Sequence, residues 1–161
     1  MREIPDPGFA GDEGVADPRL TAALASYAED PGRRHAATLE VLQHARLLVP
    51  VVAVLGERSE TGEEKTSDIA SVMMRGADGR TALLAFSGQE ALQRWDPHAR
   101  PVPVSVVTAA QAARQQNAAA LVLDVAGPVM FVVESEDLGS LAAGDTLVPV
   151  SGGHAWVRPA P

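Results

Sequence analysis

The chain has 161 residues, a formal net charge of −8 and no cysteine. This length suits one domain, and the lack of cysteine excludes disulfides and thiolate-ligated zinc. The acidic balance, with Lys65 as the single lysine, disfavours binding to nucleic acid or to an anionic membrane. No apolar run approaches the roughly 20 residues of a membrane-spanning helix, and no signal-peptide core follows the N-terminus, so the sequence predicts a cytoplasmic protein.

The first third of the chain predicts an arm and two helices. Residues 1–17 combine prolines, glycines and acids, which is typical of an extended N-terminal arm. Asp17-Pro18 is an N-cap followed by proline at the first helical position, and the apolar spacing after it predicts a helix over residues 18–29. Asp30-Pro31-Gly32 gives the same start signal for a second helix over about residues 32–44.

The middle of the chain changes from a helical period to continuous apolar runs. Residues 47–55 predict a strand buried on both faces, with Pro50 near a strand end, on an edge or at a bulge. The runs 69–75 and 81–86 flank Ala77-Asp78-Gly79, and Asp-Gly between apolar runs predicts a β-hairpin. The acidic loop 57–68 is long enough to be a lid or docking element, and a solvated insertion is the other interpretation.

Helices and strands alternate in the second half. Ser87 and Thr108 are expected to cap helices that end near Trp95 and Asn117. Strands are expected over residues 102–107, 121–124, 129–133 and 147–150. Residues 18–150 therefore predict an α/β (α+β) domain: a mixed sheet of about five or six strands with a β-hairpin, two β-α-β crossovers and two N-terminal helices. Residues 151–161 are expected to be a flexible C-terminal tail.

The sequence contains no recognisable catalytic centre. Its four histidines lie in no known motif, and there is no Gly-x-Ser-x-Gly elbow or phosphate-binding glycine loop. Ser87 follows a strand and precedes a helix, but capping explains that position. The acidic pairs lie in loops and at helix starts, where they serve solubility and the helix dipole. We therefore predict no catalytic residue, no metal ligand and no cofactor.

Four ordered stretches between residues 4 and 133 resemble the SseB protein N-terminal domain family, particularly its actinobacterial versions. They are Ile4-Pro5-x-Pro7-Gly8-Phe9-Ala10-Gly11-Asp12-x-Gly14, Leu47-Leu48-Val49-Pro50-Val51-Val52, Glu64-Lys65-x-Ser67-Asp68-Ile69-Ala70 and Ala85-Phe86-Ser87-x-x-x-Ala91-Leu92-x-x-Trp95. The resemblance implies an α/β domain and supplies no established active site. The chain ends soon after one domain, so a single-domain type, without the second domain that some members carry, is expected.

Three functional hypotheses remain open. The first is a non-catalytic protein-interaction or regulatory module that binds protein partners, a second copy through the edge strand 129–133 among them. Its candidate surface is Phe9, Asp12, Glu64, Lys65, Trp95 and Asp96, with Trp95 alternatively a core residue. The second is a small-ligand binder or enzyme at the C-terminal ends of the strands, where the candidates are Lys65, Ser87, Thr108 and Asp124. The third, docking onto a large assembly such as a ribosome, needs an arginine cluster such as Arg33, Arg34 and Arg46.

Overall fold

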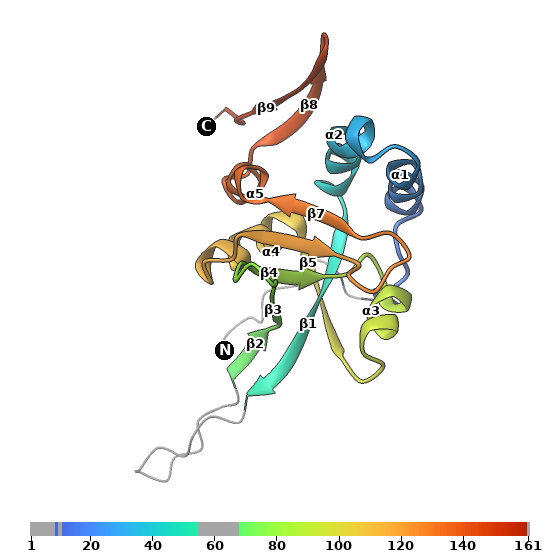
Figure 1. Ribbon diagram of the computed structural model, residues 1–161, viewed down its shortest axis with the longest axis vertical. Coiled ribbons are helices and arrows are strands. Elements are labelled where there is room, and N and C mark those ends of the chain that lie inside the picture. Colours follow the sequence, from blue (N-terminus) through green and yellow to red (C-terminus); the bar gives the residue numbers. More distant parts are fainter. Residues whose placement is uncertain (1–8, 10, 55–67, 161) are drawn as a thin grey trace.

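The computed structural model describes residue 9 and residues 11–54 and 68–160, which form an α+β fold (Figure 1). Its helices are α1 (Pro18–Glu29), α2 (Pro31–Leu42), α3 (Gln89–Trp95), α4 (Val106–Gln115) and α5 (Ser135–Ala142). Its strands are β1 (Arg46–Val54), β2 (Asp68–Ser71), β3 (Met73–Arg75), β4 (Thr81–Ala85), β5 (Arg100–Ser105), β6 (Ala120–Leu123), β7 (Phe131–Glu134), β8 (Thr146–Val150) and β9 (Gly153–Val157). The expected fold class is confirmed. None of the described helices is long and apolar enough to cross a membrane.

The helix starts follow the local sequence at α1 but not at α3 and α4. At α1, the Asp17 carboxylate accepts a hydrogen bond from the Arg19 N–H, and Pro18 is the first helical residue. The expected caps of the other two helices are wrong by one to three residues. Helix α3 is capped by Gly88, and α4 by Ser105, whose hydroxyl accepts from the Thr108 N–H. Ser87 and Thr108 are therefore free of the capping roles expected for them.

A four-stranded sheet with the order β3-β4-β6-β7 forms the centre of the fold. Strands β3 and β4 form the expected hairpin, β4 and β6 are parallel, and β7 is antiparallel to β6. Alternate residues face opposite sides: Leu83 and Leu121 belong to one core cluster, and Leu84 and Val122 to the other. Both faces of β4 and β6 are thus covered, which explains their uninterrupted apolar sequence.

The strands are distributed over more than one sheet, in place of the single mixed sheet expected. A three-stranded sheet has the order β2-β1-β5, and β8 pairs with β9 alone. Strand β1 reaches the central sheet only where the backbone groups of Leu48 and Phe86 exchange two hydrogen bonds of 2.8 Å. The connection from β4 to β6 runs through α3, β5 and α4 and inserts a strand of the other sheet between two helices.

Pro50 lies in the interior of β1, and the expectation that it marks an end, an edge or a bulge is wrong. On one side β1 pairs with β5 from Arg46 to Val51, so Pro50 is opposite Pro101. On the other side its partner changes from Phe86, opposite Leu48, to β2, whose pairing begins at Val51. Pro50 lies between these two contacts, where no ladder bond needs its missing N–H.

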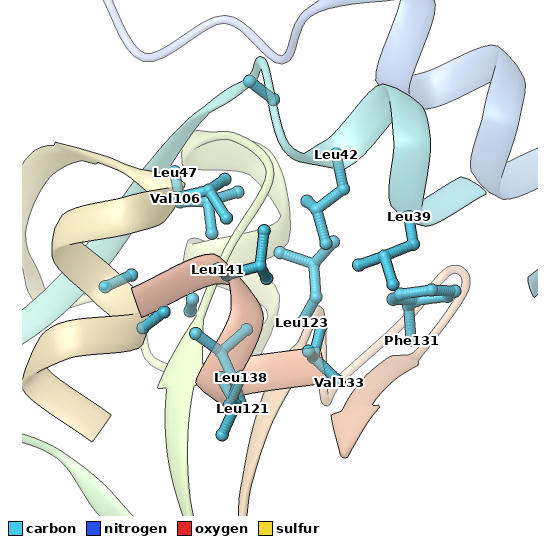
Figure 2. Close-up of a cluster of buried hydrophobic side chains, with 14 of the residues drawn as sticks. Leu39, Leu42, Leu47, Val106, Leu121, Leu123, Phe131, Val133, Leu138 and Leu141 are labelled. Atoms are coloured by element: carbon cyan, nitrogen blue, oxygen red, sulfur yellow. The ribbon is translucent and has the colours of Figure 1, made fainter. Parts of the chain in front are cut away.

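The larger core cluster is formed by helices and the central sheet together (Figure 2). Leu39 and Leu42 of α2, Leu121 and Leu123 of β6, and Phe131 of β7 converge there, each at most 2% exposed. Phe131 stacks on His35, with ring centroids 4.7 Å apart, and meets Tyr27 of α1 edge-on. This packing ties the two N-terminal helices to one face of the sheet.

The ends of the chain differ from expectation at the C-terminal side. The tail predicted to be flexible contains β9, which pairs with β8 over Gly153–Val157, so the prediction is wrong for these residues. Pairing with Leu147 and its neighbours and the Trp156 bond to Asp137 hold it in place. Of the N-terminal arm, residues 1–8 and 10 lie outside the described residues, as does most of the acidic loop, residues 57–67.

Candidate functional site

The candidate site lies where β4 and β6 end. Because these neighbouring strands are parallel, with Ala85 opposite Leu123, the residues that follow them meet at one edge of the sheet. Ser87 follows β4 and Asp124 follows β6. The Ser87 N–H donates to Asp124 Oδ1 at 2.8 Å, and its hydroxyl donates to Oδ2 at 2.6 Å. The two side chains thereby form a buried pair.

The backbone and the surroundings of Asp124 are both unusual. Its φ of 54° is left-handed, a conformation that Asn and Asp tolerate better than most residues. Its N–H donates to the Ala85 carbonyl, and its own carbonyl accepts from the Gly127 N–H, so the turn is fixed at both ends. Asp124 is 2% exposed, and burial raises the pKa of its carboxyl above the ordinary value, while the bonds from Ser87 oppose that rise.

A cleft of about 640 Å³ opens above this pair. That volume lies within the range of about 300–1,000 Å³ that small-molecule sites have. Its walls come from four segments: the arm, α1, the start of α3, and the connection between β6 and β7. The apolar lining residues are Val15, Ala16, Leu24, Ala25, Ala91, Pro128 and Val129. The polar ones are Glu13, Thr21, Ser87, Gln89, Glu90, Arg94 and Asp124.

Arg46 holds the wall that the arm contributes. Its Nε lies 2.6 Å from Asp12 Oδ2, and its terminal nitrogens donate to the carbonyls of Val15 and Ser87. The side chains of Arg46 and Asp12 are 14% and 17% exposed, so solvent screens this ion pair only in part. Arg46 therefore joins the arm to the same residue that bonds Asp124.

The arm also lies against the start of α3. The Gln89 N–H donates to the Gly14 carbonyl at 2.7 Å. A Cβ atom on Gly88 would lie 2.8 Å from the backbone nitrogen of Ala16, so only glycine permits this approach. Residues Glu13 to Ala16 of the expected extended arm thus form a wall of the cleft.

The floor of the cleft holds one hydroxyl and one carboxylate, which are bonded to each other. Ser87 gives both its donors to Asp124, and the described lining residues contain no histidine or lysine to activate it. Each Asp124 oxygen accepts one bond from Ser87 and retains capacity for a second donor. Among the residues that the structure describes, no three His, Asp or Glu side chains gather to hold a metal ion.

The structure brings together only part of the ligand site expected from sequence. Ser87 and Asp124 are in contact, as that hypothesis required. Thr108 is exposed at the start of α4, where its hydroxyl accepts from Ser105, and it does not line the cleft. Lys65 lies outside the described residues.

The expected interaction surface is likewise divided. Asp12 is engaged by Arg46, and Trp95 packs against Phe86 in the smaller core cluster, with ring centroids 5.6 Å apart. Asp96 accepts from the His98 N–H in the turn that follows α3. Phe9 is half-buried, and its carbonyl accepts from the Asp12 N–H. Glu64, like Lys65, lies outside the described residues.

Arg46 was expected only as a member of an arginine cluster, and no role was expected for Gly88. The role of Arg46 depends on an acid 34 residues earlier, and no local pattern reports such a pair. Since the guanidinium is occupied by Asp12, it is also poorly placed to join Arg33 and Arg34 in a basic docking surface. The glycine after Ser87 is the one local signal of a close backbone approach.

The comparisons with known proteins bear on family alone. No curated protein and no solved structure matches the chain significantly. The family model described as the SseB protein N-terminal domain matches residues 20–140, which is well over half of the chain. This match begins within α1, ends within α5 and includes both residues of the buried pair. The chain therefore belongs to the SseB N-terminal domain family.

Proposed function

We propose that this chain is a non-catalytic regulatory module that binds a small ligand in the cleft above Asp124. The observation that carries the proposal is the floor of that cleft, where a buried carboxylate is oriented by Ser87 and keeps acceptor capacity. A site with a mainly apolar lining and few convergent polar groups is typical of ligand pockets. Binding then acts on the arm wall and so on the surface presented to other proteins.

The lining defines the chemical class of the ligand. Seven apolar side chains require an apolar body. The lining carries three carboxylates, those of Glu13, Glu90 and Asp124, and one cationic side chain, that of Arg94. The Arg94 guanidinium lies 3.8 Å from the Glu90 carboxylate. A negative field around a carboxylate floor favours a cation. The expected ligand is a small apolar amine whose ammonium group donates to Asp124.

Thermal unfolding in the presence of apolar amines tests this proposal. At about 100-fold excess over the dissociation constant, a ligand adds about 2.7 kcal/mol, which raises Tm by about 5–10 °C for a chain of this size. Asp124→Asn keeps the shape of the floor and should abolish the preference for the amine over the matching alcohol. Ala25→Phe on α1 should block binding, because Ala25 lines the cleft.

Two control variants accompany these measurements. Ala22→Phe adds the same bulk to an exposed position of α1 outside the cleft lining. Thr108→Ala removes the ligand candidate that lies elsewhere. Both should respond to the amines as the unaltered chain does. Equal Tm shifts in the Ala25→Phe and Ala22→Phe variants would show that the cleft is not the site.

A protein-interaction module is the second candidate, and the rim of the cleft favours it. Val15 is 73% exposed on the arm, and Met130 is exposed beside the lining residue Val129. Exposed apolar side chains around a hollow are typical of protein contacts. If a protein partner occupies this rim, Met130→Asp should release it from the tagged chain, while the amine response of the cleft should persist, because Met130 does not line the cleft.

The remaining assignments follow from the family and the charge. We propose that the chain represents the actinobacterial type of its family, on the stretches it shares with those versions. We propose a cytoplasmic location, with protein partners and without a cofactor. The net charge of −8 supports the expectation that neither nucleic acid nor an anionic membrane is a partner.

A further inference from the structure

Three of the edge strands, β5, β7 and β8, are blocked in different ways. At β5, Pro101 and Pro103 lack the N–H groups that would point outward. Leu48 uses its own N–H and C=O on Phe86, so it and its β5 partner Pro103 form a pair without mutual hydrogen bonds. The nitrogen of Pro103 therefore faces away from β1. Prolines at an edge prevent the addition of another strand.

Side chains cover two further edges. On β7, the strand expected from sequence to mediate self-association, the Val132 carbonyl lies 3.2 Å from His35 Nε2. On β8, the side-chain amide of Gln43 accepts from the Leu147 N–H at 2.7 Å and donates to the Leu147 carbonyl at 2.8 Å. Gln43 thus takes the place of a neighbouring strand. Both edges are protected by contacts within the chain.

Strand β9 has no such protection among the described residues. Its backbone bonds only to β8, and its residues Gly153–Val157 carry no acid, lysine, arginine or proline. The hairpin projects from one end of the molecule (Figure 1), and the His154 side chain of β9 lies 3.0 Å from the Glu40 carboxylate of α2. This edge is open to another strand.

One face of the hairpin is apolar and turned away from the body. Leu147 and Trp156 form an inward pair, with Trp156 bonded to Asp137 of α5. The pairs on the other face are Thr146 with Val157, Val148 with Ala155, and Val150 with Gly153. Val150 and Val157 are each 46% exposed. The outward face therefore presents valines and an alanine without any charge.

We propose that β9 pairs antiparallel with β9 of a second copy of this chain, about a two-fold axis through Ala155. In this register Gly153 lies opposite Val157 of the other copy, and His154 lies opposite Trp156. The missing side chain of Gly153 leaves room for Val157, and no like charges oppose each other in a chain of net charge −8. The product is a four-stranded sheet with one continuous apolar face, and the contact is isologous.

Sedimentation of the full chain over a dilution series tests this dimer. The unaltered chain should change from monomer to dimer with rising concentration. Ala155→Lys places two ammonium groups opposite each other at the axis and should weaken dimerisation about fivefold or more. Ala155→Glu should act alike, whereas an equimolar mixture of the two variants should dimerise again, since lysine then opposes glutamate. Val148→Lys is the matched control, because Val148 pairs with Ala155 but lies on β8.

Any of the following results would overturn the proposal. A chain that stays monomeric at all concentrations has no such interface. Equal losses from Val148→Lys and Ala155→Lys would indicate packing of the apolar faces, and a mixture that stays monomeric would exclude the two-fold register. Fluorescence of Trp156 checks that the hairpin remains folded. In the unaltered chain, hydrogen exchange at Gly153–Val157 should slow as concentration rises, which tests the edge without any substitution.

Discussion

Replacing Asp124 by alanine should lower the free energy of unfolding of the chain by more than the loss of one small side chain would suggest. The reason is that Asp124 joins the ends of β4 and β6 through Ser87. The substitution leaves the N–H and the hydroxyl of Ser87 without acceptors at a position only 6% exposed. A buried unpaired group costs about 1–3 kcal/mol. Alanine at a φ of 54° adds about 1 kcal/mol. Water from the cleft can reach one of the two donors, so the expected total is about 2–4 kcal/mol.

Asparagine at the same position separates shape from charge. Its Oδ1 accepts from the Ser87 N–H, its Nδ2 donates to the Ser87 hydroxyl, and it tolerates the left-handed backbone. We expect Asp124→Asn to change stability by less than about 1 kcal/mol near neutral pH. Urea unfolding, followed by the fluorescence of Trp95 and Trp156, measures both variants.

The two variants also differ in how stability depends on pH. Burial raises the native pKa of Asp124 above that of the unfolded chain, so the native state binds this proton more tightly. The contribution of Asp124 to stability therefore falls as pH rises from the ordinary carboxyl range through the native pKa, and it is constant above that pKa. The Asn variant lacks this slope. An alanine variant as stable as the Asn variant would refute the reasoning, since it would mean that Ser87 does not need its acceptor.

Three further substitutions, one of them with a matched control, test the arm and the core. Arg46→Met removes the contacts to Asp12 and to the Val15 and Ser87 carbonyls, so hydrogen exchange at residues 11–17 should accelerate while β6 stays protected. Unchanged exchange would mean that Arg46 does not hold the arm. Gly88→Ala should destabilise the chain by about 1–3 kcal/mol, because the new Cβ would lie 2.8 Å from the Ala16 nitrogen. In the control variant Gly32→Ala, the new Cβ meets open space, so the change should be neutral or stabilising by up to about 1 kcal/mol. Phe131→Ala should destabilise it by about 3–5 kcal/mol by emptying the stack on His35, and a smaller loss in chemical unfolding would show that the helices collapse onto the space.

Local patterns were sufficient where the determining contacts lie within a few residues. The Asp17-Pro18 signal predicted the start of α1, and Asp78-Gly79 predicted the hairpin of β3 and β4. The apolar runs predicted β4, β6 and β7 because covered strands have no polar face to alternate. These features need only backbone propensity and the period of the side chains.

Only part of the candidate site could be predicted from local patterns. Placing Ser87 and Asp124 at strand ends predicted that they could meet, and they do. From sequence, Ser87 was interpreted as a helix cap, because its actual hydrogen-bond acceptor, Asp124, lies 37 residues later in the chain. Arg46 and Asp12 are 34 residues apart, and Gly88 meets an arm that composition made look unstructured. Contacts of this range leave no periodic signal in the chain.

The sequence by itself determined most of the helices and strands, the apolar core positions and the net charge of −8, because these depend on residue type and local spacing. Tertiary structure decided the division into separate sheets, the pairing of β9 with β8, and the cleft above Asp124. The physical reason is that each of these arises when strands distant in sequence become neighbours. Only then does the Asp124 carboxylate, at the end of one strand, accept its hydrogen bonds from Ser87 instead of from water.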